Sequence, residues 1–287
     1  MKIAKDNMQQ AFDPQRFKQQ ERAGYNMIAA RYEDASAARV PIMERMLELC
    51  DLSPGQSLLE VASGPGMLAR EAARRVAPNG KVVAADIAEA ALEAGRLRAA
   101  AEGLPNIRFQ VEDAEAMSFA AASFDRIVCS MGLMHFPDAA AATRDMQRVL
   151  KPGGRLVAAV WGDEARVPFL ACALHCLKRN LPPPKTERPS IFRFGSAAAL
   201  SALMEGAGFA DIHVETTGVE AAVPDAATYW RNFLDLAGVT TVALAKLPQE
   251  MQNKLADDVA FDLEPFRHGA GYVLPGEVLI VAAANPR

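Results

Sequence analysis

Four groups of residues that could bind a ligand or take part in a reaction lie at the ends of short apolar runs in the first half of the chain. In chain order they are Glu60 with the turn Ala62, Ser63, Gly64, Pro65 and Gly66; Asp86 with Ile87; Asp113 with Ala114; and Ser130 with Met131. A glycine-containing turn between a strand and a helix lets the backbone approach a ligand and points helix N–H groups at it. An acidic residue about 20 positions further on can accept hydrogen bonds from both ribose hydroxyls. Asp113 could accept a hydrogen bond from an adenine amino group.

Each of these features also has an ordinary structural explanation. A glycine-containing turn by itself is also found where no ligand binds. Asp86 precedes an expected helix and could cap its N-terminus, a role that is compatible with ribose binding. The order and spacing of all four groups therefore carry more information than any one of them.

The elements that must position these groups alternate between strand and helix. We expect strands at Ser57–Val61, Lys81–Ala85, Ile107–Val111, Phe124–Cys129 and Arg155–Trp161, and helices at Met67–Val76, Ala90–Ala101 and Ala139–Leu150. This alternation predicts an α/β fold with a mostly parallel sheet between helices. The carboxyl ends of parallel strands meet at one edge of the sheet, where ligands bind. The four groups should therefore lie together.

The segments that flank this core predict a lid and a cap. We divide the chain into an N-terminal helical lid (1–40), a core (41–162), a first cap insertion (163–208) and the last sheet strands (209–287). The last part contains a second helical cap insertion at about 225–267. We expect the four parts to form one integrated domain, with the cap over the active edge of the sheet.

Five segments extend the pattern to a family resemblance. LLEVASGPG, VVAADI, VEDAE, SFDRIVCSMGLMHF and LKPGGRLV occur in this order. Together they resemble class I S-adenosylmethionine-dependent methyltransferases, in the branch of the ubiquinone/menaquinone-biosynthesis C-methyltransferases (methyltransferase domain 11-like). The resemblance covers roughly residues 40–161. It implies a Rossmann-like seven-stranded sheet whose last strand is antiparallel, S-adenosyl-L-methionine as cofactor and S-adenosyl-L-homocysteine as product.

The resemblance also implies a role for each matching residue. Glu60 and the turn Ala62–Gly66 would hold the methionine part of the cofactor. Asp86 would bind the ribose, and Ile87, Asp113 and Ala114 would surround the adenine. Ser130 and Met131 would lie beside the sulfonium, and Tyr32 resembles a lid tyrosine. The sequence departs from the general motif at Ala62, where the first glycine is expected; the side chain is small, and the related branch often has alanine there.

Two histidines are candidates for a general base. His135 follows the fourth strand at the edge that carries Ser130, and His175 lies in the first cap helix. Histidine titrates near neutrality, but a base is needed only if the acceptor is a poor nucleophile such as a hydroxyl or an activated carbon. His135 could instead pack against its own loop. Apolar walls of an acceptor pocket are expected from Trp161, Phe169, Tyr229 and Trp230, which could equally form the core of the cap.

Composition narrows the class of protein. The net charge is −4 and 51% of residues are apolar, which is typical of a soluble globular protein and not of a nucleic-acid binder. No apolar run is long enough to span a membrane, and the first ten residues do not resemble a signal peptide. The four scattered cysteines indicate a reducing, cytoplasmic location. Cys172 and Cys176 with His175 have no second ligand cluster, so we expect no metal.

We therefore expect a methyltransferase that acts on a small, mainly apolar molecule resembling a quinone, a polyketide or another secondary metabolite, as a monomer or homodimer. The sequence does not separate C-, O- and N-methylation. An NAD(P)-dependent oxidoreductase is the first alternative, although Gly64-Pro65-Gly66 is followed by Met67, Leu68 and Ala69 rather than by the full GxGxxG spacing. A catalytically silent cofactor-binding module that acts through partners is the second.

Overall fold

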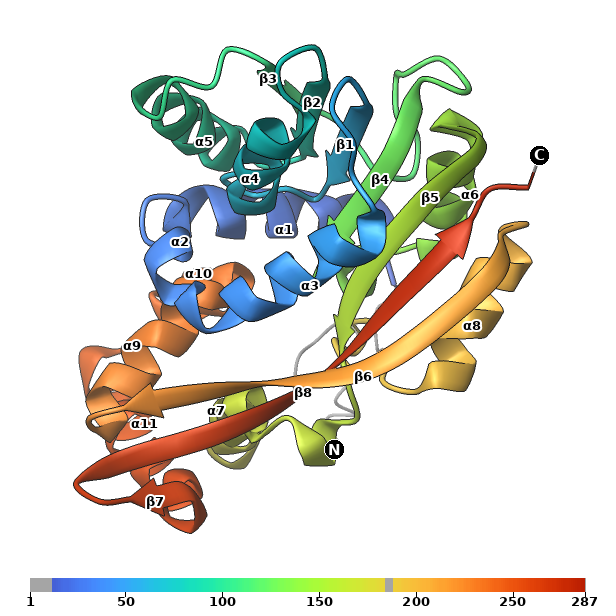
Figure 1. Ribbon diagram of the computed structural model, residues 1–287. Coiled ribbons are helices and arrows are strands. Elements are labelled where there is room, and N and C mark those ends of the chain that lie inside the picture. Colours follow the sequence, from blue (N-terminus) through green and yellow to red (C-terminus); the bar gives the residue numbers. More distant parts are fainter. Residues whose placement is uncertain (1–11, 184–187, 287) are drawn as a thin grey trace, which may run out of the picture.

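The computed structural model describes residues 12–183 and 188–286 (Figure 1). Its strands are β1 (Ser57–Val61), β2 (Lys81–Asp86), β3 (Ile107–Val111), β4 (Phe124–Ser130), β5 (Leu150–Trp161), β6 (Ala210–Val223), β7 (Arg267–His268) and β8 (Gly271–Ala284). Its α-helices are α1 (Pro14–Ile28), α2 (Tyr32–Ala35), α3 (Val40–Cys50), α4 (Met67–Val76), α5 (Glu89–Ala101), α6 (Ala139–Val149), α7 (Pro168–Asn180), α8 (Ala197–Gly206), α9 (Ala226–Leu236), α10 (Gly238–Leu244) and α11 (Gln249–Leu263). The expectation about a signal peptide concerns residues that lie outside the described part.

The strands form one sheet in the order β3-β2-β1-β4-β5-β8-β6. Strands β1 to β5 pair with one another in parallel, and β8 runs antiparallel to both β5 and β6. This confirms the predicted seven-stranded, mostly parallel sheet with an antiparallel last strand. The two-residue strand β7, which pairs with β8, is an addition that the sequence analysis did not predict.

Helices cover both faces of this sheet because each parallel strand needs a crossover connection. Helices α3 and α4 contact each other on one face, and α6 and α8 contact each other on the other. Helix α4 shows why: Leu68, Ala72 and Val76 recur at helical spacing and are fully buried. The core is the resulting continuous layer of apolar side chains on either side of the sheet.

The last two long strands extend beyond the rest of the sheet. Strand β5 pairs with β8 only from Val278 to Ala284, whereas β6 pairs with β8 back to Tyr272. The far halves of β6 and β8 therefore form a two-stranded ribbon, which projects to the lower left of Figure 1. Helices α9, α10 and α11 connect these two strands, and α7 packs against α11. These helices fall in the segments that the sequence analysis assigned to cap insertions.

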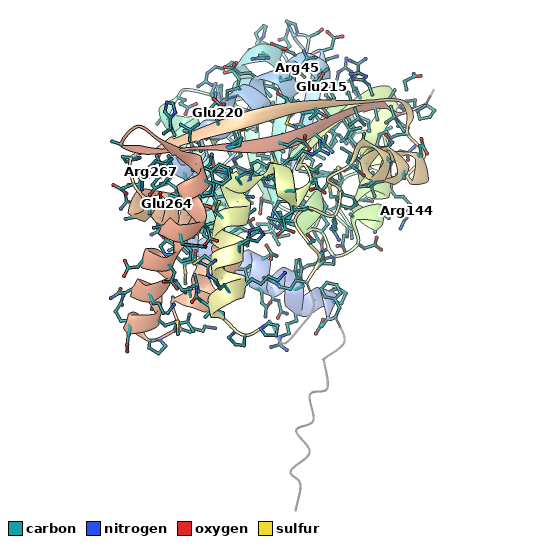
Figure 2. All side chains as sticks on the ribbon, turned by 90° about the horizontal axis from the view of Figure 1, so that it is seen from below. Arg45, Arg144, Glu215, Glu220, Glu264 and Arg267 are labelled. Atoms are coloured by element: carbon teal, nitrogen blue, oxygen red, sulfur yellow. The ribbon has the colours of Figure 1, made fainter. Side chains whose placement is uncertain are left out.

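The outer surface is joined by ion pairs between elements that are distant in sequence. Arg45 of α3 forms two hydrogen bonds with Glu215 of β6, at 2.7 and 2.8 Å, and the two residues are labelled together in Figure 2. Exposed pairs of this kind contribute little individually. Within the described residues, none of the helices combines the length and the apolarity that a membrane span requires.

Candidate functional site

The turn after β1 is held in a left-handed conformation. Ala62, Gly64 and Gly66 have φ angles of 55°, 53° and 70°. A Cβ on Gly66 would lie 2.8 Å from the ring of Phe109, so this position requires glycine for space as well as for conformation. Ala62 is strained, because an L-residue with a side chain rarely adopts such a φ. This explains why a glycine is expected at position 62 of the general motif.

Glu60 links the end of β1 to the start of α4, on either side of this turn. Its side chain is buried, and its Oε2 accepts a 2.8 Å hydrogen bond from the backbone N–H of Ala69, at the start of α4. Burial raises the pKa of Glu60 to about 8, against the lowering effect of that hydrogen bond. The carboxyl group is therefore largely protonated at neutral pH.

Asp86 ties the turns after β1 and β2 together. Its two carboxylate oxygens accept hydrogen bonds from the backbone N–H groups of Gly64 and Ala88, both at 2.8 Å. Burial raises the pKa of Asp86, and the backbone donors oppose that effect. Each carboxylate oxygen retains a second lone pair that can accept from a ligand hydroxyl.

A cavity at this edge of the sheet, here called the strand-edge cavity, collects most of the predicted ligand-binding residues. The predicted residues that line it are Tyr32, Ala62, Gly64, Pro65, Asp86, Ile87, Asp113, Ala114, Ser130, Met131 and His135. Glu60, Ser63 and Gly66 are not among its lining residues; Glu60 and Ser63 are buried behind the turn. The topology thus brings the ends of four strands into one wall, as the sequence pattern predicted.

Helix α1 closes this cavity from the opposite side. Lys18 Nζ bonds to Asp113 Oδ2 at 2.7 Å and to Glu115 Oε2 at 2.6 Å. Asn26 Oδ1 accepts from the backbone N–H of Ala90 at 2.9 Å. Lys18, Glu21 and Tyr25 all line the cavity, and the sequence analysis missed all three. Their spacing of three and four residues, which places side chains on one face of a helix, was the available signal.

A second cavity of about 350 Å³, here called the acceptor cavity, adjoins the first. Three parts of the chain build it: the lid (Phe17, Glu21, Tyr25, Tyr32, Arg39), the sheet edge (Met131, Met134, His135, Trp161) and the cap (Glu164, Leu170, Leu174, 188–192, Phe233 and 236–240). Most of these side chains are apolar or aromatic. The volume and lining are typical of a small-molecule site.

The two cavities meet at five shared residues. These are Glu21, Tyr25, Tyr32, Met131 and His135. The hydroxyl of Tyr25 lies 3.3 Å from Nε2 of His135, and Oε2 of Glu21 lies 3.4 Å from its Nδ1. Burial raises the pKa of Tyr25 well above its ordinary value. A carboxylate on one imidazole nitrogen and a hydroxyl on the other is an arrangement that can hold and transfer a proton.

Arg39 is a buried cation beside this junction. It is 9% exposed, and its guanidinium lies over the ring of Tyr32, 5.0 Å from the centroid. Its Nη2 donates to Ser36 Oγ, whereas its buried Nε has no hydrogen-bond partner among the described residues. Tyr32 in turn contacts the turn after β1, since a Cβ on Gly64 would lie 3.6 Å from its ring. A guanidinium with a free donor favours an anionic group here.

The other predicted residues lie elsewhere. The side chain of His175 is 54% exposed and pairs with Glu164 at 3.1 Å, so it faces solvent and is not among the residues that line either cavity. Of the four predicted pocket residues, only Trp161 lines the acceptor cavity. Phe169, Tyr229 and Trp230 are buried instead in the core, where the hydroxyl of Tyr229 donates to Phe169 O at 3.0 Å.

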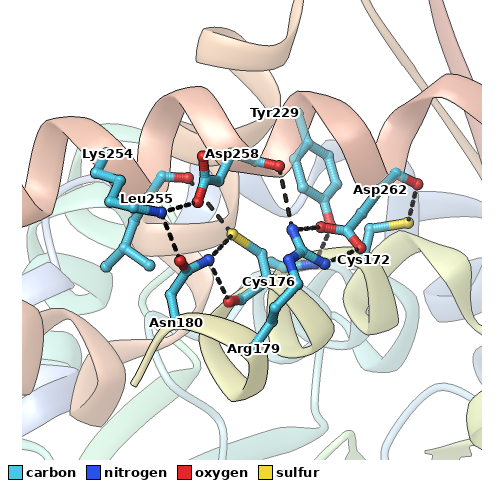
Figure 3. A network of polar contacts seen from close by, with 10 residues as sticks. Cys172, Cys176, Arg179, Asn180, Tyr229, Lys254, Leu255, Asp258 and Asp262 are labelled. Carbon is cyan, nitrogen blue, oxygen red and sulfur yellow. Dashed lines mark hydrogen bonds and ion pairs between the residues drawn. The ribbon is translucent and has the colours of Figure 1, made fainter.

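The two cysteines of α7, Cys172 and Cys176, are free thiols buried between helices. Cys172 Sγ donates to Asp262 O at 3.3 Å and Cys176 Sγ to Leu255 O at 3.5 Å, which joins α7 to α11 (Figure 3). Arg179 reinforces the same contact with two 2.8 Å bonds to Asp262. Over residues 12–183 and 188–286, no group of three or more His, Cys, Asp and Glu residues has a geometry suited to a metal ion.

Comparison with known sequences agrees with this geometry. A family model described as a methyltransferase domain matches residues 58–154. Nocamycin O-methyltransferase of Saccharothrix syringae is 40% identical over 116 residues, which are 40% of this chain and 41% of that protein. The ubiquinone/menaquinone biosynthesis C-methyltransferase UbiE of Hahella chejuensis is 44% identical over 139 residues, 46% of this chain and 56% of UbiE. The chain thus spans about half the length of the curated relatives it matches.

Solved structures resemble the fold more completely. Phosphoethanolamine N-methyltransferase 2 of Haemonchus contortus, in complex with S-adenosyl-L-methionine, superposes with a TM-score of 0.60 at 19% identity, over 96% of this chain and 61% of that one. The YcgJ protein of Bacillus subtilis gives 0.59 at 16% identity, over 85% and 98%. At this identity the likeness concerns the fold alone.

Proposed function

We propose that the chain is an S-adenosylmethionine-dependent methyltransferase that acts on a small, mainly apolar acceptor. Residues 58–154 match the methyltransferase-domain family model, and the fold is of the class I, Rossmann-like type. The observation that carries the proposal is the junction of two cavities at Tyr25, Met131 and His135. One cavity is lined by the motif residues and the other by apolar side chains. Methyl transfer requires a cofactor and an acceptor to meet in line at such a point.

The strand-edge cavity suits the charge of this cofactor. Four acidic residues line it, Glu21, Asp86, Glu112 and Asp113, together with Lys18, His135 and two tyrosines; Lys18 pairs with Asp113, and Arg188 pairs with Glu21. An acidic lining favours a ligand with a sulfonium and an ammonium group. Apolar side chains that also line the cavity, among them Ile87 and Ala114, suit a purine ring. The residues present therefore fit the cofactor.

We assign roles on this basis. Asp86 would bind the ribose hydroxyls, Ile87 and Ala114 would contact the adenine, and Asp113, which already accepts from Lys18, would lie at its edge. Ser130 and Met131 would lie near the sulfonium, and Tyr32 would cover the methionine part together with the turn at 62–66. Arg39 lines the acceptor cavity and stacks on Tyr32, which contacts Gly64, so its free donor would pair with the methionine carboxylate where the two cavities meet.

The chain's own contribution is to position the acceptor, exclude water and move a proton. The cofactor supplies an electrophilic methyl group. His135 would accept the proton that the acceptor loses on taking the methyl group, while the sulfur–methyl bond breaks and S-adenosyl-L-homocysteine is left, and Glu21 would orient the imidazole. Apolar walls favour a quinone-, polyketide- or secondary-metabolite-like acceptor. The named relatives include both C- and O-methyltransferases, and a base at the junction serves either reaction.

The alternatives have less support. A nicotinamide dinucleotide carries a pyrophosphate, which the acidic lining of the strand-edge cavity disfavours. A catalytically silent module would not need an acceptor cavity of about 350 Å³ beside the cofactor site. We also propose a cytoplasmic location, supported by four cysteines that are free and buried, and a monomeric or homodimeric state.

Isothermal titration calorimetry with S-adenosyl-L-methionine, S-adenosyl-L-homocysteine and NAD(P)H tests the cofactor. We expect dissociation constants in the micromolar range for the first two and none measurable for the third. A panel of phenols, quinols, enols and carboxylic acids, incubated with methyl-labelled cofactor, then tests transfer. Preferential binding of nicotinamide cofactors would refute the proposal; cofactor binding without transfer to any acceptor would favour the silent module.

A further inference from the structure

Arg193 connects the wall of the acceptor cavity to the turn that carries His135. It follows Ile191 and Phe192, which line the cavity, and its guanidinium lies over the ring of Phe194 at 4.8 Å. Its Nη2 donates to the backbone carbonyl of Leu133 at 3.1 Å and also to that of Phe136. One nitrogen thus binds carbonyls on both sides of His135, which lies 58 positions earlier in the chain by the numbering.

Two buried side chains, Leu133 and Met134, anchor this turn in the core, and the backbone N–H groups of Gly132 and Leu133 contact the Cys129 thiol. Leu133–His135 is a single 3₁₀ turn after β4, closed by a 2.9 Å bond from His135 N to Gly132 O. The following bond, from Phe136 N to Leu133 O, is long at 3.5 Å. A turn this short has poor hydrogen-bond geometry and gains stability from outside partners. The two bonds from Arg193 supply such partners to the carbonyls that flank the histidine.

Burying this arginine has a free-energy cost. Its Nε is buried without a hydrogen-bond partner among the described residues, and Glu115 and Asp138 act on its charge through space. Desolvation lowers the pKa of Arg193, and the two carboxylates oppose that effect. The carbonyls of Leu133 and Phe136 are therefore the partners that offset the desolvation of the guanidinium.

We propose that Arg193 is a positioning residue for His135: it fixes the turn 133–136, so that the imidazole stays in contact with Tyr25 and Glu21, and it links this geometry to the cap segment that contacts the acceptor. The proposal rests on the proposed role of His135 as a base. It predicts that loss of Arg193 acts on the histidine and leaves the cofactor site intact.

An acceptor-independent measurement tests the geometry. The rings of Tyr25 and His135 are 5.7 Å apart, close enough for a nuclear Overhauser effect (NOE) in protein labelled at histidine and tyrosine, with the signals assigned from His135→Gln. We expect this NOE to be lost in Arg193→Met. In Arg193→Lys it should fall to less than half of its wild-type intensity, because an ammonium lacks the planar fork of a guanidinium.

Arg126→Met is the matched control. Arg126 also bonds to backbone carbonyls, those of Cys50 at 2.7 Å, Asp125 at 2.9 Å and Asp51 at 3.2 Å, but outside both cavities. Its loss should leave the NOE unchanged. A wild-type NOE in either folded Arg193 variant would overturn the proposal, and Arg193→Lys decides the matter if Arg193→Met does not fold.

Kinetics with an acceptor from the panel test the consequence. Arg193→Met should lower kcat at least 10-fold while the dissociation constant of S-adenosyl-L-homocysteine stays within 2-fold. In a His135→Gln background the same substitution should cause no further loss of kcat, because residues that act through one group are not additive. Independent, multiplying losses would contradict the coupling. If no acceptor is found, the proposed function fails while the NOE still reports on Arg193.

Discussion

The backbone N–H of Gly64 donates a 2.8 Å hydrogen bond to Oδ2 of Asp86. Together with the 3.0 Å bond from Ser63 N to Ala85 O, it joins the turn after β1 to the end of β2. The Asp86 carboxylate lines the strand-edge cavity with Ile87 and the glycine turn. The acidic residue at this position therefore has two tasks, because it shapes the turn and it presents oxygens to a ligand.

Asp86→Ala should weaken the binding of S-adenosyl-L-homocysteine about 10- to 100-fold, since a charge-assisted hydrogen bond contributes about 1.5–3 kcal/mol. Calorimetric titration measures the change. Asp125→Ala is the control, because Asp125 also accepts a 2.8 Å bond from a backbone N–H, that of Ser57, but lies outside both cavities. An equal dissociation constant for Asp86→Ala and wild type would remove Asp86 from the site.

Arg39→Met should weaken S-adenosyl-L-homocysteine binding by about 10-fold or more, because the carboxylate of the ligand would lose its cationic partner. Binding of 5′-methylthioadenosine, which lacks the amino-acid carboxylate, should stay within 2-fold of wild type. The two titrations together identify the group that Arg39 binds. If both ligands weaken equally, Arg39 acts on the shape of the lid, and if neither does, its partner is the acceptor.

His135→Gln should lower kcat about 10²- to 10⁴-fold for an acceptor that must lose a proton, which is the usual contribution of a general base. His175→Gln serves as the control, since His175 is exposed and pairs with Glu164. Steady-state kinetics of the two variants and the wild type at one pH measure the difference. An unchanged kcat in His135→Gln would show that His135 is not a base and that the enzyme acts by holding the acceptor close to the cofactor.

Glu60→Gln should change the pH dependence of stability. The pKa of Glu60 is raised from 4.5 to about 8 in the folded protein. Between these values the unfolded chain releases a proton that the folded chain keeps, so the wild-type free energy of unfolding falls by up to about 1.4 kcal/mol per pH unit as the pH rises. Above pH 8 both states are ionised and the decline stops.

Urea unfolding of ligand-free protein at pH 5, 6.5 and 8 measures this effect. Glutamine keeps a side-chain oxygen that accepts from Ala69 N–H, and it does not ionise. The stability of the variant relative to wild type should therefore increase from pH 5 to 6.5 and again from pH 6.5 to 8. Glu205→Gln, on the exposed surface of α8, should follow the wild-type curve. Parallel curves for wild type and Glu60→Gln would show that Glu60 is ionised in the folded state.

Gly238→Ala should loosen the lid. A Cβ on Gly238 would lie 2.4 Å from the carbonyl carbon of Gly24, so α10 and α1 touch through their backbones at this point. We expect a loss of about 1–3 kcal/mol in the free energy of unfolding from this overpacking, with faster amide hydrogen exchange in α1. Gly206→Ala, where no atom lies within 4 Å, should cost nothing or add up to about 1 kcal/mol. Equal exchange rates in α1 of both variants would argue against the contact.

The order of strands and helices could be read from the sequence because the central parallel strands β1 and β2 are buried on both faces, whereas helices such as α4 are buried on one. Strands β1 and β3 and helix α4 begin and end where the pattern placed them. The sequence pattern also predicted that motif residues such as Asp86 and Met131 lie in one site, because the carboxyl ends of parallel strands share one edge of the sheet. Local spacing was sufficient for that wall of the site, which is built from consecutive strands.

Only the tertiary structure determined the opposite wall and the acceptor cavity. Tyr25 lies 3.3 Å from His135 across 110 positions, and Arg193 reaches the turn of that histidine from the cap. Such contacts depend on how α1 and the cap pack on the sheet, which no short-range pattern encodes. For the same reason Tyr229 and Phe233, one turn apart on α9, differ: Tyr229 lies in the core, whereas Phe233 lines the acceptor cavity. Hydrophobicity predicts that a side chain is buried, and tertiary packing determines which residues or which cavity it contacts.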